Sequence, residues 1–165
     1  MNEPVKSVYE KMIQLYSGDP KRIQHFTKVH AYATIIGAGE NLSDSQMQIL
    51  EIAALTHDIG IHYCETKYGE CGGKLQEEEG PRIARKLLRE ADIEKSVIEQ
   101  VCFLIAHHHT YSGVDSADWQ ILLEADFIVN AFEDDLGRCA VITGYKNIFK
   151  TESGKLLCRT IYGID

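Results

Sequence analysis

Two adjacent side chains that can bind metal, His57 and Asp58, close a stretch rich in Leu, Ile and Ala. Two more, His25 and Asp126, stand where the apolar pattern of other predicted helices faces inward. A buried carboxylate without a partner is costly even after the protein relaxes. Imidazole nitrogens and carboxylate oxygens suit a divalent cation such as Mn, Fe, Co, Ni, Zn or Mg. We therefore predict that His25, His57, Asp58 and Asp126 surround one divalent ion, which would activate a bound water.

Apolar residues at helical spacing predict the three helices that carry these side chains. His25 lies on the inner face of a helix over about residues 20–37. His57 and Asp58 end a helix that begins near Ser43, where Gln46 completes the pattern of a capping box. Asp126 lies on the inner face of a helix over residues 119–132. We expect these helices to bring the four side chains together.

The rest of the chain shows no strand alternation, so we predict an all-α fold, a single-domain helical bundle. The expected domain covers residues 1–165, with a motif core at about 20–132 and a helical C-terminal extension at 133–165. Glycines punctuate the polar segment from Gly60 to Gly80, which we expect to form a long loop near the site. Further helices are predicted at 4–16, 81–89 and 93–109, with two short ones around Gly144 and Gly154.

Composition narrows the classes of partner. The chain has 165 residues, 44% of them hydrophobic, and a formal net charge of −8. It has no run of Lys or Arg, so we do not expect a nucleic-acid polymer as partner. No apolar run approaches the ~20 residues that span a bilayer, and residues 1–9 do not resemble a signal peptide. Five scattered cysteines suggest reduced thiols, so we expect a cytoplasmic protein; the sequence does not indicate its oligomeric state.

The order His25, His57-Asp58, Asp126 resembles the H…HD…D signature of the HD-domain superfamily of metal-dependent phosphohydrolases. The resemblance runs from about Arg22 to Asn130 and includes the stretches Leu55-Thr56-His57-Asp58-Ile59-Gly60 and Leu123-Glu124-Ala125-Asp126. It implies an all-α HD-type fold, a bound divalent metal and hydrolysis of a phosphoester or phosphoanhydride. His25, His57, Asp58 and Asp126 would be the metal ligands. Asp58 would also orient or deprotonate the attacking water.

Departures from the family pattern concern a second metal. Members with two metals often have a His at the position of Gln76, which is followed here by Glu77. They also use one or two His after the fifth helix, where this chain has His107, His108 and His109. Half of a second site is therefore present. We favour one metal, with His108 and His109 serving the substrate or a weak second ion, and His108 in the best helical phase.

The basic side chain that would bind a phosphate group also differs from the one in the family pattern. Many members have Lys three residues after the Asp of the HD pair, where this chain has Ile61. Arg22, one helical turn before His25, is our first candidate, because a guanidinium group matches phosphate oxygens. Weaker candidates are Lys67, Lys74, Arg82 and Lys150.

The sequence therefore predicts a metal-dependent phosphohydrolase acting on a small phosphorylated substrate, with a nucleotide as one candidate. Two alternatives stay open. Some HD-type proteins hold two irons and carry out oxygenation, which needs the second set of ligands that Gln76 interrupts. A protein with intact metal ligands could also be a non-catalytic sensor of a nucleotide or metal.

Overall fold

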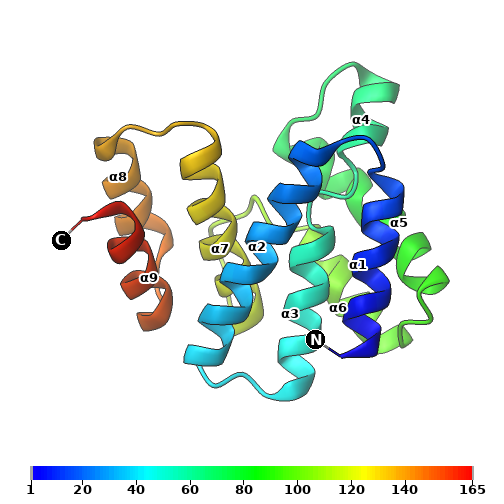
Figure 1. Ribbon diagram of the computed structural model, residues 1–165, viewed down its shortest axis with the longest axis horizontal. Coiled ribbons are helices and arrows are strands. Elements are labelled where there is room, and N and C mark those ends of the chain that lie inside the picture. The colour runs from blue at the N-terminus through cyan, green and yellow to red at the C-terminus, as the bar shows by residue number, and fades with distance from the viewer. Residues whose placement is uncertain (1, 165) are drawn as a thin grey trace.

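The computed structural model describes residues 2–164. Over this range the chain folds into nine helices without a strand, which confirms the all-α prediction (Figure 1). None of these helices combines the length and apolar character needed to cross a membrane. The helices are α1 Glu3–Leu15, α2 Pro20–Gly39, α3 Asp44–Thr56, α4 Ile61–Tyr68, α5 Gly73–Glu90, α6 Lys95–Ile105, α7 Ala117–Glu133, α8 Arg138–Ile148 and α9 Glu152–Tyr162.

Side-chain caps define where two of the three helices of the predicted site, α2 and α3, begin. The Asp19 carboxylate accepts a hydrogen bond from the Arg22 backbone N–H at the start of α2. At the start of α3, Ser43 and Gln46 each accept from the other's backbone N–H, which is the predicted capping box. Because such caps satisfy N–H groups that have no partner within the helix, both helices begin where the sequence indicates.

The predicted long loop between Gly60 and Gly80 is wrong. Residues 61–68 form α4, a four-residue connection follows, and α5 starts at Gly73. Gly69 ends α4 in the left-handed conformation, with φ 77°. Pro81 lies inside α5 instead of at its start. The glycine-rich composition suggested a loop, but Gln76 and Gly80 pack inward along α5, and tertiary packing of this kind overrides weak local propensity.

Helix α3 lies at the centre of the molecule and packs against α1, α2, α6 and α7 (Figure 1). Helix α2 lies between α3 and α7 and contacts both. Ala53, Ala54 and Leu55 of α3 are fully buried, as is Phe26 of α2. The predicted metal ligands therefore extend from the most heavily packed helices, which favours a rigid site.

Two glycines set the distance between the HD turn and α5. A Cβ added to Gly60 would lie 3.1 Å from the Cα of Gly80, and one added to Gly80 would lie 2.8 Å from Cγ2 of Ile105 in α6. Since backbone atoms cannot rotate away as a side chain can, this close approach favours glycine at position 60. Gln76, one turn earlier on α5, contacts His108, whose Nε2 also lies 3.0 Å from Asp58.

The C-terminal helices α8 and α9 pack against α7, and α9 also contacts α2. Glu124 of α7 is fully buried and accepts hydrogen bonds from the backbone N–H groups of Lys150, at 2.7 Å, and Thr151, at 3.0 Å. This carboxylate therefore fixes the start of α9 against the helix that carries Asp126. The two short helices predicted around Gly144 and Gly154 are confirmed. The division into a motif core and an extension stays a prediction.

Candidate metal centre

Four side chains from three elements converge at the C-terminal end of α3. The Nε2 atoms of His25 and His57 lie 3.1 Å apart. Oδ1 of Asp126 lies 3.4 Å from each of them. Oδ2 of Asp58 lies 3.6 Å from Nε2 of His25 and 3.7 Å from Nε2 of His57. The structure thus brings together all four residues that the sequence predicts as metal ligands.

The other nitrogen of each imidazole fixes the direction of the ring. Nδ1 of His57 lies 2.9 Å from the Ala54 carbonyl oxygen, and Nδ1 of His25 lies 2.8 Å from Oε2 of Glu133. A carbonyl or an ionised carboxylate can only accept, so both Nδ1 atoms must donate. A neutral ring then presents Nε2 as a bare lone pair. Both lone pairs point into the same small space.

That space fits a divalent cation. Oδ1 of Asp126 is buried and has no hydrogen-bond partner among the described residues. Metal–ligand bonds of about 2.1 Å place neighbouring ligands of an octahedral ion about 3 Å apart, close to the separations seen here. Two imidazole nitrogens and two carboxylates form a ligand set for Mn, Fe, Co, Ni or Zn, and the oxygens also suit Mg. A cation would satisfy the orphaned oxygen and both lone pairs at once.

The pKa values of the metal-free cluster also show that its two carboxylates favour a positive charge between them. Burial would lower the pKa of His25, but the carboxylate of Asp126, 3.4 Å from its Nε2, and the charge of Asp58 raise it to about 9. The pKa of His57 is also raised despite its burial, because Asp58 and Asp126 lie beside it. Burial would raise the pKa of Asp58, but His57 and His108 hold it at about 2. Without a metal ion, the imidazoles therefore carry the positive charge that the carboxylates require.

Glu133 belongs to this site, and the sequence prediction missed it. It holds Nδ1 of His25, and its other oxygen pairs with the Lys28 ammonium group. Carboxylates in this position orient a metal-binding imidazole and increase its basicity. Glu133 lies seven residues after Asp126, two turns along α7, so both side chains lie on the same face of the helix. The seven-residue spacing from Asp126 was the sequence signal that could have identified Glu133.

A second group of side chains extends from Asp58 toward α5. Oδ1 of Asp58 lies 3.0 Å from Nε2 of His108, which is also 3.2 Å from Oε1 of Gln76. Gln76 also contacts Nε2 of His109. Asp58, His108 and His109 form a second group that could hold a metal ion. The buried Gln76 fills the space between the two rings, and its amide oxygen faces the Nε2 atoms of both.

The remaining candidates of this group have different surroundings. Glu77 accepts hydrogen bonds from the backbone N–H of His109, at 3.0 Å, and the hydroxyl of Thr110, at 2.9 Å. It therefore fixes the turn after α6. Nδ1 of His107 donates to the Phe103 carbonyl, and the His107 ring packs against Phe103. The structure does not bring His107 into either metal-type group.

A cavity of about 160 Å³ opens beside the cluster and is lined by His25, Asp58, Lys21 and Arg22, among others. Arg22 donates to Asp19 and Glu65, so its charge is already paired. Lys21 makes no ion pair with any residue in 2–164, and the sequence prediction missed it. The weaker candidates lie outside this lining: Lys67, Lys74, Arg82 and Lys150.

Comparisons with known proteins identify the family and the fold. The model of the HD domain family matches residues 22–131, most of the chain. A crystal structure of a predicted HD superfamily hydrolase from an uncultured Thermotogales bacterium is similar in fold, with a TM-score of 0.68 and 24% sequence identity. The match covers 96% of this chain and 84% of that one. A search of curated proteins finds no match. The chain belongs to the HD domain family.

Proposed function

We propose that this protein is a metal-dependent phosphohydrolase that cleaves a phosphoester or phosphoanhydride bond in a small substrate. Membership of the HD domain family supports a metal-dependent hydrolase at the level of the family. The observation that carries the proposal is the convergence of His25, His57, Asp58 and Asp126 around the orphaned Asp126 oxygen. A divalent ion held there would polarise a phosphoryl oxygen and lower the pKa of a bound water.

The cavity beside the cluster supports a phosphoryl group as the reacting part of the substrate. Its volume of about 160 Å³ suits such a group, while a larger leaving group would extend outside. Lys21 brings to its lining an ammonium group that makes no ion pair with any residue in 2–164, and this cation would offset the charge of the phosphate. Ile61 cannot supply such a charge, and the Arg22 guanidinium is already paired with Asp19 and Glu65.

Asp58 and His108 provide a route for the proton of the attacking water. One oxygen of Asp58 faces the imidazoles of His25 and His57, and the other lies 3.0 Å from Nε2 of His108. Asp58 can therefore orient a water on one side and pass its proton to His108 on the other. The Ile105 carbonyl fixes the His108 ring by accepting from its Nδ1, at 2.7 Å.

We favour one metal ion per chain. Gln76 lies between His108 and His109, and an amide is a poor ligand for a transition metal compared with imidazole. A di-iron oxygenase would need both groups of side chains to hold iron. Counting metal per chain by plasma emission spectrometry separates these functions, since two irons with oxygen-dependent turnover would contradict the hydrolase.

The direct test is phosphate release by metal-loaded protein from a panel of nucleotides and simple phosphoesters. We expect turnover with wild type and a loss of at least about 100-fold with Asp58→Ala, because it removes a ligand and the proton acceptor together. The matched control is Asp44→Ala, which removes an exposed carboxylate from the opposite end of α3. Equal release by wild type and Asp58→Ala would contradict catalysis, and metal binding without any turnover would favour a sensor.

A further inference from the structure

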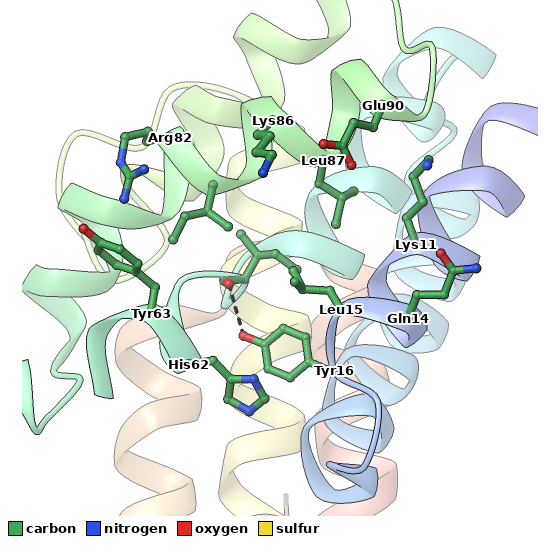
Figure 2. Close-up of a pocket in the computed structure, with 12 residues that line it drawn as sticks. Lys11, Gln14, Leu15, Tyr16, His62, Tyr63, Arg82, Lys86, Leu87 and Glu90 are labelled. Atoms are coloured by element: carbon green, nitrogen blue, oxygen red, sulfur yellow. Dashed lines mark hydrogen bonds between the residues drawn. The ribbon is translucent and has the colours of Figure 1, made fainter. Parts of the chain in front are cut away.

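A second, larger cavity lies away from the metal centre. Its volume is about 760 Å³, within the range of small-molecule sites, and it is enclosed by α1, the HD turn, α4 and α5 (Figure 2). We call it the α1–α5 groove. Its lining consists of Lys11, Gln14, Leu15, Tyr16, Ile59, His62, Tyr63, Arg82, Ile83, Lys86, Leu87 and Glu90.

The groove is locally basic in an acidic protein. Lys11, Arg82 and Lys86 line it, against a single carboxylate, Glu90, although the chain carries a net charge of −8. Lys11 and Lys86 make no ion pair among residues 2–164. Figure 2 shows Lys86 and Arg82 on α5 at one side and Lys11 on α1 at the other. Two ammonium groups without an ion-pair partner in the described part of the chain therefore border the same cavity.

Apolar side chains form the surface between these cations. Ile59 and Leu87 line the groove and are nearly fully buried, whereas Leu15 is 49% exposed. The Arg82 guanidinium lies over the Tyr63 ring, 4.6 Å from its centre, and holds the Arg82 side chain along the rim. A ligand with an apolar body would cover Leu15 while its charged group meets Lys86.

The groove and the metal-site cavity have no lining residue in common. Tyr16 lines the groove and contacts the HD turn from that side. Its buried hydroxyl donates to the carbonyl oxygens of Asp58 and Ile59, each at 3.1 Å, and Figure 2 draws one of these bonds. Burial raises the pKa of Tyr16, so its hydroxyl keeps the proton that it donates. A molecule in the groove would therefore lie behind the HD turn and away from the reacting atoms.

We propose that the α1–α5 groove binds a small organic anion, one acidic group carried on a compact apolar body. The argument rests on charge complementarity with Lys11 and Lys86, on the uncovered apolar surface of Leu15, and on the volume. The groove is a ligand site separate from the phosphohydrolase centre and does not depend on that proposed function.

Calorimetric titration with phenylphosphonate, which has a ring and an acidic group but no hydrolysable ester, tests the proposal. We expect wild type to bind phenylphosphonate at least tenfold more tightly than inorganic phosphate, because the ring buries apolar surface. Lys86→Gln should weaken binding at least fivefold. Arg89→Gln, which removes one exposed charge of α5 outside the groove, should change it less than twofold.

Measurements with and without a chelator, and on Lys21→Gln, assign the site. Binding that survives chelation and Lys21→Gln but weakens in Lys86→Gln supports the groove. Loss of binding on chelation or in Lys21→Gln, with Lys86→Gln unaffected, would place the anion at the metal centre and overturn the proposal. Absence of binding at millimolar phenylphosphonate, or equal weakening by Lys86→Gln and Arg89→Gln, would also overturn it. Thermal melts check that each variant folds.

Discussion

At the scale of single residues, the candidate metal centre depends on which nitrogen of each imidazole is free. Ala54 and Glu133 accept from the Nδ1 atoms of His57 and His25, so both Nε2 atoms point at Oδ1 of Asp126. The Glu133 carboxylate can be changed by mutation, whereas the Ala54 carbonyl belongs to the backbone and cannot. Glu133 is therefore the place where the ligand arrangement can be perturbed without removing a ligand.

We predict that Glu133→Gln weakens metal binding about 10- to 100-fold. The amide still accepts from Nδ1 of His25, but it lacks the negative charge that raises the basicity of the ring. Competition with a chelating dye measures the affinity. Asp134→Asn is the matched control, since it changes a neighbouring carboxylate that is exposed. Equal affinities of the two variants would show that Glu133 has no role in positioning His25.

At the scale of elements, the site depends on how closely the HD turn approaches α5. Gly60 and Gly80 allow two backbones to pack against each other, and Gln76, one turn before Gly80, lies in contact with His108. The segment that follows the HD pair is thus a packed helix pair, α4 and α5, and it does not form the predicted loop.

We predict that Gly60→Ala lowers the free energy of unfolding by about 1–3 kcal/mol, because the new Cβ would lie 3.1 Å from backbone atoms of Gly80. Metal affinity should fall as well, since Gly60 lies two residues after Asp58. Chemical denaturation of metal-free protein measures the first effect. The matched control is Gly72→Ala, whose Cβ would meet nothing within 4 Å. If both variants were equally stable, the close approach would not constrain the fold.

At the scale of the whole molecule, the metal centre couples stability to pH. In the metal-free protein the pKa of His25 is raised from its ordinary 6.5 to about 9. A group whose pKa is higher in the folded state stabilises the protein fully below its unfolded pKa, and this stabilisation is lost as the pH rises through the folded pKa. Metal ions require the deprotonated imidazole, so metal binding gains strength over the same range.

We therefore predict that metal-free protein loses up to about 3 kcal/mol of stability from His25 between pH 6.5 and 9. Metal-loaded protein should keep its stability over this interval, because the ion replaces the proton. Urea unfolding at a series of pH values, with and without a chelator, measures both curves. His25→Asn should flatten the metal-free curve, and an unchanged slope in that variant would assign the pH dependence to other groups.

The sequence by itself was sufficient for the helical fold and for the four residues of the candidate metal centre. Helical periodicity placed His25 and Asp126 on inner faces, and the capping box marked the start of the helix that ends at His57. These signals are local: each depends on residues within a few turns of one helix.

Only the tertiary structure decided which other side chains join them. Glu133 comes close to His25 through the packing of α2 against α7, whereas Lys21 lies one turn before His25 on α2 itself. The segment from residue 60 to 80 is helical because Gln76 and Gly80 face buried neighbours, and its own composition favoured a loop. Local propensities contribute less to the free energy of folding than the burial and close packing that long-range contacts supply. Contacts between helices therefore decided these features.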